Sequence, residues 1–396
     1  RGARARSRRG TDMNGAEQLI GDSSLVVVCG SGGVGKTTMA AALGTALATS
    51  REARVLVLTV DPARRLADAL GLSGIGNDPV RVDLDSHAGR GSLHVAMIDT
   101  KVSWDALIDR HAPTPEIRDR VLANPLYRNL TERFVHSHDY IAMERLYAEF
   151  TSGNYDVIVV DTPPSRNALD VLDAPRRMRE FFGSRLLKLL TTATSTGVLS
   201  LASRPFFQVA DRILGQRFLG DITEFFTLLR SMESGFVTRA TDVERTLQDE
   251  HTAFVVVTTL ETAPLYEAQF LLAELTKRKF GLRGVVANRV IDRAVVSAAR
   301  DAADRLGVVT EDSAVVRELT TLVAGARPTD VQRVMAGALE RVSAIDAVSS
   351  TQERRLEQLR GALAPLGAAV WISGLRGTDI SDVDSLVDLG RGVTRT

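Results

Sequence analysis

The stretch Leu25-Val-Val-Val-Cys-Gly-Ser-Gly-Gly-Val-Gly-Lys-Thr-Thr38 decides the fold, because a short apolar run leads directly into a glycine-rich loop. An unbroken apolar run of this length is typical of a strand buried in a parallel sheet. The loop fits the pattern G-x-x-x-x-G-K-[ST], with Gly30, Gly35, Lys36 and Thr37 at the specified positions. The stretch therefore predicts a strand, a phosphate-binding loop and a helix, in that order.

The chemistry of this loop requires these residue types. Glycines let successive backbone N–H groups approach phosphate oxygens without clashes from Cβ atoms. Lys36 is expected to reach the β- and γ-phosphates, and the hydroxyl of Thr37 is expected to bind Mg²⁺. The predicted nucleotide-binding residues of the loop are consecutive: Gly30, Ser31, Gly32, Gly33, Val34, Gly35, Lys36, Thr37 and Thr38.

A dinucleotide site is the competing interpretation of the same glycines. Gly30, Gly32 and Gly35 also satisfy G-x-G-x-x-G, and Asp61 ends the second predicted strand, where such folds hold ribose hydroxyls. The run Lys36-Thr-Thr38 favours a triphosphate with Mg²⁺. A second acid, Asp161, ends another apolar strand and suits a metal-assisted phosphate site.

Apolar runs recur along the chain and alternate with helical patterns. They lie at 55–60, 93–98, 157–160, 254–257, 284–287 and 368–372. Alternating strands and helices predict an α/β fold with a doubly wound, mostly parallel sheet. Helical insertions without strand patterns are expected at about 105–150 and 174–250, where they would form an α-helical subdomain, and residues 291–366 are also expected to be helical.

Composition and charge limit the classes of function. The chain has 396 residues, 44% hydrophobic and 25% charged, which is typical of a folded globular protein. Its 49 basic residues balance 49 acidic ones, so no nucleic-acid partner is predicted. We expect residues 1–23 to form a basic, disordered tail, in which Met13 is a candidate start, and residues 24–396 to form one P-loop domain.

Other local signals concern location and metals. The sequence contains no apolar run of about 18 residues and no secretory signal, so we expect a cytoplasmic protein that reaches a membrane only through a partner. The single cysteine, Cys29, excludes a cysteine-cluster zinc site within one chain. In His136-Ser-His138 the two histidines would face different sides of a helix, so no metal pair is predicted.

Three motifs in combination resemble the ArsA-type ATPase family. They are GSGGVGKTT at 30–38, TVDPARRLADALG at 59–71 and VIVVDTPPSRNALDVLD at 157–173. This family includes ATPases that drive arsenite pumps and ATPases that target tail-anchored membrane proteins. The resemblance covers most of residues 24–390 and implies a P-loop NTPase-type fold, ATP and Mg²⁺ as cofactors, and hydrolysis of ATP to ADP and phosphate.

The resemblance also implies roles for three residues outside the loop. Asp61 would position the attacking water, so Asp61 and Lys36 are the expected catalytic residues. Asp161 would hold Mg²⁺ through water, opposite Thr37. Asn288 would recognise adenine, and the segment 373–376 would flank it. From the residues alone, Asp61, Asp161 and Asn288 could each also be a cap or turn residue at a strand end.

The chain departs from the family pattern in ways that bear on its partners. The family usually carries a lysine where Ser31 stands, and that lysine reaches the phosphates of a partner subunit. Arg64 stands where a histidine is usual, and the paired cysteines that bind zinc or arsenite are absent. We therefore expect a homodimer, or a heterodimer with a related chain that carries the missing lysine, no zinc, and slow hydrolysis by the isolated chain.

Three roles fit these observations: an ATP-driven switch that binds an apolar client or partner, an energising subunit of a membrane anion transporter, and a low-turnover nucleotide sensor in a heteromeric complex. Eight of the 13 phenylalanines lie between 181 and 236. They form either the core of the helical subdomain or part of an apolar groove. The phenylalanines are Phe181, Phe182, Phe206, Phe207, Phe218, Phe225, Phe226 and Phe236.

Overall fold

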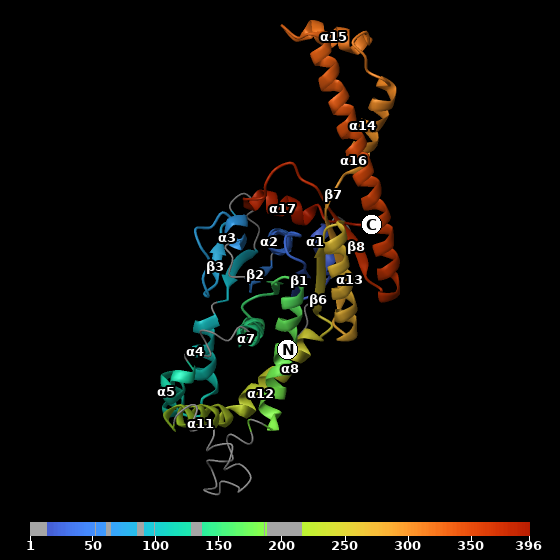
Figure 1. The fold of residues 1–396 in the computed structure, drawn as a ribbon. Helices are drawn as coiled ribbons and strands as arrows, with labels where there is room; N and C mark the ends of the chain where they lie inside the picture. The colour runs from blue at the N-terminus through green and yellow to red at the C-terminus, as the bar shows by residue number, and fades with distance from the viewer. Residues whose placement is uncertain are drawn as a thin grey trace.

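The computed structural model describes residues 14–51, 53–60, 65–84, 91–98, 100–127, 137–185, 187 and 216–396. The predicted α/β architecture is confirmed, because these residues form a mostly parallel sheet covered by helices (Figure 1). The strands are β1 (Leu25–Gly30), β2 (Arg54–Thr59), β3 (Val80–Val82), β4 (Ser92–Met97), β5 (Val157–Asp161), β6 (Thr252–Thr258), β7 (Leu282–Val290), β8 (Ala369–Gly374) and β9 (Thr394–Arg395).

The order of the nine strands is β3-β4-β2-β5-β1-β6-β7-β8-β9. All seven strands predicted from apolar runs are present and pair in parallel. The edge strands β3 and β9 are antiparallel and were not predicted, because both are short and largely exposed. β1 lies between β5 and β6, so the loop after β1 sits at the centre of the sheet's carboxyl edge.

Successive side chains of β1 point to opposite faces of the sheet, so they belong to two separate hydrophobic cores. Val26 and Val28 pack with the helices on one face, including α1 (Gly15–Ile20), α2 (Lys36–Ser50) and α17 (Val383–Arg391). Leu25, Val27 and Cys29 pack on the opposite face with helices that include α13 (Thr262–Lys277). Both faces of the central strand are therefore covered, as its continuous apolar run requires.

The predicted helical insertions form a layer at one end of the sheet (Figure 1). Its helices begin before the predicted bounds, since the first starts at Thr100 and another starts directly after the β5 segment at Ser165. The helices are α4 (Thr100–His111), α5 (Pro115–Ala123), α7 (Ser137–Ser152), α8 (Ser165–Gly183), α11 (Gln216–Ser231) and α12 (Glu233–Leu247).

The described phenylalanines of this layer largely form a core. Phe182, Phe225 and Phe236 are buried, and the rings of Phe182 and Phe236 stack with centroids 5.4 Å apart. Phe181 alone among the described ones is exposed above a third of its surface, at 38%. Phe206, Phe207 and the side chain of Phe218 lie outside the described residues, so the groove stays a prediction for that part of the segment.

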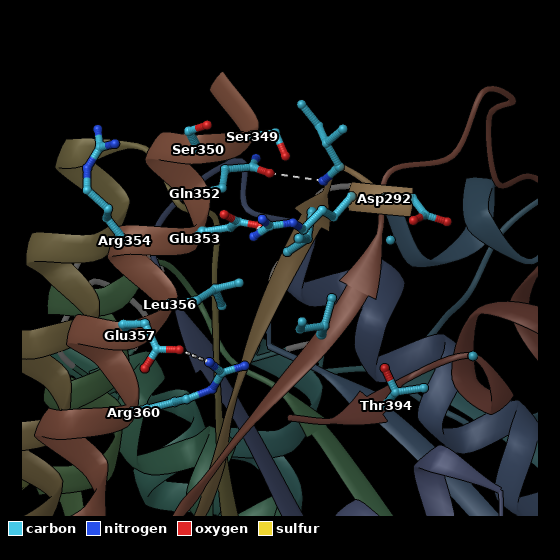
Figure 2. A pocket seen from close by; sticks show the side chains of 16 residues that line it. Asp292, Ser349, Ser350, Gln352, Glu353, Arg354, Leu356, Glu357, Arg360 and Thr394 are labelled. Atoms are coloured by element: carbon cyan, nitrogen blue, oxygen red, sulfur yellow. Dashed lines mark hydrogen bonds and ion pairs between the residues drawn. The ribbon is translucent and has the colours of Figure 1, made fainter. Parts of the chain in front are cut away.

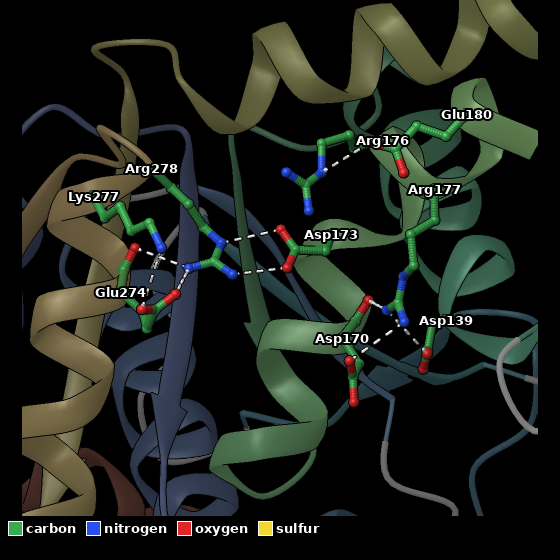
Figure 3. Close-up of polar contacts among 9 residues, drawn as sticks. All are labelled: Asp139, Asp170, Asp173, Arg176, Arg177, Glu180, Glu274, Lys277 and Arg278. Carbon is green, nitrogen blue, oxygen red and sulfur yellow. Dashed lines mark hydrogen bonds and ion pairs between the residues drawn. The ribbon is translucent and has the colours of Figure 1, made fainter. Parts of the chain in front are cut away.

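Ion pairs fasten α8 to its neighbours (Figure 3). Arg278, which follows α13, binds both carboxylate oxygens of Asp173 at 3.0 and 2.7 Å. Burial raises the pKa of Asp173, but the guanidinium of Arg278 outweighs it and holds the pKa below its ordinary value. Arg177 pairs with Asp170 and Asp139. The middle of α8 is thus tied both to α13 and to α7.

A helical arm projects from the sheet at the end opposite the insertions (Figure 1). It consists of α14 (Arg293–Leu306), α15 (Ala314–Leu322) and α16 (Pro328–Leu363), and a 3₁₀ turn at Ala364–Leu366 follows. α16 has 36 residues, a length of about 54 Å at 1.5 Å per residue. Its buried residues start only at Ser349, so residues 328–348 stand clear of the sheet.

The predicted disordered tail over residues 1–23 is wrong for residues 14–23. Asn14 caps α1 through a capping box with Glu17, which satisfies two backbone N–H groups at the helix start. Leu19 and Ile20 are fully buried in the core beside α17. Residues 14–23 therefore belong to the folded domain, and residues 1–13 lie outside the described residues.

Close packing of α2 on the sheet gives a first prediction. A Cβ added to Gly44 would lie 2.4 Å from Cγ2 of Val57 on β2. Gly44→Ala should therefore cost about 1–3 kcal/mol of unfolding free energy through overpacking, measured by urea denaturation. Gly361→Ala on α16 is the control, since its added Cβ meets nothing within 4 Å and should be neutral or stabilising. Equal stabilities for the two variants would contradict this account of α2 packing.

Candidate functional site

The loop between β1 and α2 is shaped by close backbone approaches and left-handed turns. A Cβ on Gly30 would lie 2.1 Å from the carbonyl oxygen of Val257 on β6. Gly33 and Gly35 have φ angles of +77° and +93°, a region that side chains disfavour. A Cβ on Gly35 would also come within 2.5 Å of Nδ2 of Asn288. The geometry of the loop therefore requires glycine at positions 30, 33 and 35, whereas a Cβ on Gly32 would meet nothing within 4 Å.

Lys36 places its charge against this loop. The side chain is buried, and Nζ donates a 2.8 Å hydrogen bond to the backbone oxygen of Ser31. Lys36 is also the first residue of α2, and the preceding Gly35 provides no side-chain cap. The ammonium group of Lys36 and the positive end of the helix dipole therefore lie at the same loop. Two positive groups beside a loop of backbone N–H donors favour the binding of a phosphate.

The remaining loop residues divide by exposure. Gly32 and Gly33 are exposed at the tip, whereas Ser31 and Val34 are buried and Thr38 is half-buried in the first turn of α2. The hydroxyl of Ser31 has no hydrogen-bond partner among the described residues. Ser31 thus supplies a backbone acceptor to Lys36, and its short neutral side chain supplies no charge.

Asp161, the last residue of β5, is hydrogen-bonded to residues of α2 and β2. Its carboxylate is fully buried, and Oδ2 accepts hydrogen bonds from Thr37 Oγ1 at 2.7 Å and Thr59 Oγ1 at 3.1 Å. Thr37 lies on α2 and Thr59 on β2. The predicted pair of Mg²⁺ residues is therefore in direct contact. Hydroxyl and carboxylate oxygens are the ligands that Mg²⁺ prefers, so this donor set fits the ion.

The predicted catalytic Asp61 lies outside the described residues, as does Arg64. The chain is described up to Val60, whose N–H donates to the backbone oxygen of Asp161 at 3.1 Å. The strand that leads to Asp61 therefore ends beside the Mg²⁺ residues. The role of Asp61 stays a prediction.

Asn288 contacts the loop from the end of β7, and its role in recognising adenine stays a prediction. Its Nδ2 donates to the backbone oxygen of Val34 at 2.8 Å, and its Oδ1 accepts from the N–H of Arg289. Arg289 adopts a left-handed conformation with φ +59°, and the pairing of β7 with β8 shifts at the same point. The backbone kink turns the side chain of Asn288 toward the loop.

Gln352 on α16 holds this kink and was not predicted from the sequence. Its Oε1 accepts from the N–H of Ile291 at 2.9 Å, and its Nε2 donates to the backbone oxygen of Arg289 at 3.4 Å. The amide stands at the top of a cavity of about 920 Å³ between α16 and the ends of β7 and β8 (Figure 2). No local motif marks Gln352, because its partners lie some 60 residues earlier in the chain.

The segment 373–376, predicted to flank adenine, continues from β8 beside the kink. Ser373 is buried, and the N–H of Leu375 donates to the backbone oxygen of Val290 at 2.8 Å. Leu375 is 58% exposed. The segment is therefore close to the end of β7, which bears Asn288, and its contact with adenine stays a prediction.

Cys29 lies under the loop but is chemically inert. Burial raises the pKa of its thiol to about 12, although the hydroxyl of Thr162 lowers it. A thiol with this pKa stays neutral at physiological pH and does not act as a nucleophile.

In the part of the chain that the structure describes, no cluster of three or more His, Cys, Asp or Glu residues has the geometry to hold a metal ion. His136 and the side chain of His138 are outside it. Among the helices described, none has the length and apolarity to cross a bilayer.

Comparison with known proteins identifies a family. Residues 23–309 match the model for anion-transporting ATPases of the ArsA type. The chain is 31% identical to ATPase GET3 of Malassezia globosa over 263 residues, which cover 66% of this chain and 71% of that protein. It is 28% identical to an ATPase ASNA1 homologue of Plasmodium chabaudi chabaudi, over 71% of this chain and 66% of that protein. The matched range ends at residue 309, before α15 and α16.

The contacts of Gln352 predict a role in base recognition. Gln352→Ala should weaken ATP binding about fivefold, because losing support of the kink releases Asn288, a loss of roughly 1 kcal/mol. The affinity for inorganic triphosphate should not change, since the phosphates contact the loop. Both affinities are measured by calorimetry. Gln358→Ala, at an exposed position on the same helix, is the control. Equal losses for ATP and triphosphate would contradict a role specific to the base.

Proposed function

The chain belongs to the ArsA family of anion-transporting ATPases. From this premise we propose that ATP binding and hydrolysis at the loop switch the helical subdomain between states that bind and release an apolar client or partner protein. We place this cycle in the cytoplasm. The cofactors of the proposed reaction are ATP and Mg²⁺, held by the loop, Thr37 and Asp161.

The observation that carries this proposal is the short path from Asp161 to the subdomain. Thr162 is fixed to β1, since its N–H and Oγ1 both donate to the backbone oxygen of Val28, at 3.2 and 2.8 Å. Two prolines follow, and α8 begins at Ser165. A change at the Mg²⁺ residues therefore reaches α8 through a segment with few free backbone torsions.

α8 in turn reaches the aromatic core of the subdomain. It packs on α7 and α12, and Phe182 near its end stacks on Phe236 of α12. The ion pairs of Arg278 with Asp173 and of Arg177 with Asp139 link the middle of α8 to α13 and α7, so we expect a movement at its start to shift the helix as one unit. Such a rigid element suits a two-state switch that biases a binding surface.

In the proposed reaction Asp61 orients the water that attacks the γ-phosphate, and Lys36 stabilises the charge that develops on the transferred group. Mg²⁺, when bound, neutralises charge on the phosphate oxygens. Asp161 holds the hydroxyl of Thr37 in place for the ion through the 2.7 Å hydrogen bond.

We further propose that full activity requires a second chain. Ser31 carries no charge where the family lysine would reach a partner's phosphates, so a homodimer lacks that cation. A related chain with the lysine would supply it in a heterodimer. Two other roles, an energising subunit of an anion transporter and a low-turnover sensor, use the same nucleotide site. The sensor differs from the switch because it predicts the same hydrogen exchange of the subdomain in both nucleotide states.

A nucleotide-locked variant tests the switch. Asp61→Asn should bind ATP but barely hydrolyse it, because the amide keeps the shape and loses the charge that orients water. Hydrogen exchange in α8 and α12 should then differ between its ATP and ADP complexes. Lys36→Ala, which should lose tight ATP binding, is the control and should show one exchange pattern.

Two outcomes would contradict this proposal separately. Turnover by Asp61→Asn within about twofold of the native chain removes Asp61 from the mechanism. Identical exchange of the subdomain in both nucleotide states removes the switch and favours the sensor.

The turnover rate tests the need for a second cation. The isolated chain should hydrolyse ATP slowly, and Ser31→Lys or added related chain should raise the rate, since a cation supplied in trans is worth roughly 10³-fold or more in phosphoryl transfer. Steady-state phosphate release measures both. Ser31→Gln, which adds length without charge, is the control. Fast turnover by the unmodified pure chain would contradict the proposal.

A further inference from the structure

Thr59, the last residue of β2, is placed beside Asp161 by the register of the sheet. β2 and β5 pair in parallel with Thr59 opposite Asp161, so the two side chains point to the same face. α2 covers that face, because Val57 and Val159, two residues earlier on each strand, pack in the core that contains residues of α2. The strand pairing therefore brings the Thr59 hydroxyl to the carboxylate on the side where Thr37 also lies.

The backbone of Thr59 is held by both neighbouring strands. Its oxygen accepts a 3.1 Å hydrogen bond from the N–H of Ile98, which follows β4, and the N–H of Val60 donates to the backbone oxygen of Asp161. The residue is 2% exposed. A buried β-branched side chain in the middle of a sheet has few accessible rotamers. The hydroxyl is therefore a fixed donor to which the carboxylate of Asp161 conforms.

Two hydroxyl groups donate to the same oxygen of Asp161, and they differ in what they do for Mg²⁺. Thr37 gives its single hydroxyl proton to Oδ2 at 2.7 Å, which leaves its oxygen lone pairs for the ion expected there. Thr59 gives its proton to Oδ2 at 3.1 Å. Thr37 thus belongs to the predicted metal site, whereas Thr59 contacts that site through the carboxylate.

The torsion that turns a carboxylate is soft, so its orientation depends on the donors around it. Because Thr37 is expected to bind the ion itself, its own position depends on whether the ion is present. Thr59 lies on a strand and is held by β4 and β5 whether or not an ion is present. The Thr59 hydroxyl is therefore the donor that orients Asp161 from the side of the sheet.

We propose that Thr59 is a positioning residue for Mg²⁺, whose hydroxyl keeps the carboxylate of Asp161 in the orientation in which Asp161 and Thr37 hold the ion. This role rests on the proposed reaction at the loop. It gives a function to the first residue of the motif at 59–71, which the motif alone did not provide. Partners that hold a metal ligand from behind commonly matter for metal affinity nearly as much as the ligand does.

A structural role for the same hydroxyl predicts a different result. A buried carboxylate needs donors in any folded chain, so Thr59 could serve only to stabilise the end of β5. Loss of the hydroxyl would then lower the stability of the chain without nucleotide and leave its affinity for the metal unchanged. The positioning role predicts that the affinity for the metal falls and that any side chain with a hydroxyl at this place preserves it.

Binding of Mn²⁺ in the presence of the non-hydrolysable analogue adenylyl imidodiphosphate distinguishes the two roles. Mn²⁺ takes the same oxygen ligands as Mg²⁺, and electron paramagnetic resonance follows its binding without any turnover. Thr59→Val keeps the shape of the side chain and removes the hydroxyl, so it should weaken Mn²⁺ binding by about tenfold or more. Thr59→Ser keeps the hydroxyl and should stay within about threefold of the native chain.

Thr45→Val is the matched control. Thr45 on α2 is also fully buried, but its hydroxyl donates to the backbone oxygen of Ala41 at 2.7 Å and not to Asp161. This variant should bind Mn²⁺ like the native chain. The affinity of every variant for ATP in EDTA should be unchanged, because the phosphates contact the loop. If Thr59→Val does not fold, Thr59→Ala removes the same hydroxyl and provides the same comparison with Thr59→Ser.

Two results would overturn the role of Thr59. One is a Thr59→Val chain that binds Mn²⁺ as tightly as the native chain, which would leave the hydroxyl with a structural role alone. The other is an equal loss in Thr59→Val and Thr59→Ser, which would assign the effect to the packing of the methyl group. A native chain that binds no Mn²⁺ with the analogue would instead overturn the proposed reaction and this role together, so the two failures are distinguishable.

Discussion

The buried carboxylate of Asp161 is the interaction on which the rest of the structure depends. It accepts hydrogen bonds from Thr37 on α2 and Thr59 on β2 while it sits at the end of β5. A fully buried carboxylate is costly unless donors surround it. These hydrogen bonds fix the start of α2 relative to the carboxyl ends of β2 and β5. The loop between β1 and α2 leads directly into the end of α2 that is held in this way.

A second series of hydrogen bonds connects the loop to the end of β7 and, through it, to α16. Val34 accepts from Asn288, Arg289 follows in a left-handed conformation, and Gln352 of α16 accepts and donates on either side of that kink. The base of the arm is thus hydrogen-bonded to the residue predicted to read the nucleotide base. The backbone kink at Arg289 is the feature that allows a strand end and a long helix to share this site.

The two helical extensions differ in how they treat apolar side chains. The subdomain gathers Phe182, Phe225 and Phe236 into a closed core. The arm instead leaves Val334, Ile345 and Val348 open to solvent, beyond the part of the chain that the family model matches. Burial in the first case stabilises the fold of one chain, whereas the exposed side chains in the second contribute little to that stability. The nucleotide site therefore lies between one helical extension with a closed apolar core and another with exposed apolar side chains.

The amino-acid sequence by itself determined the loop, the seven parallel strands and the acid at the end of β5. These features rest on consecutive residues and on short-range periodicity, which a single chain displays directly. Only the tertiary structure revealed Thr59 and Gln352, whose partners lie about 100 and 60 residues away along the chain. It also placed Ala16, Leu19 and Ile20 in the core and left Val334, Ile345 and Val348 of α16 exposed. Neither is visible locally, because the burial of a side chain depends on which distant elements pack against it.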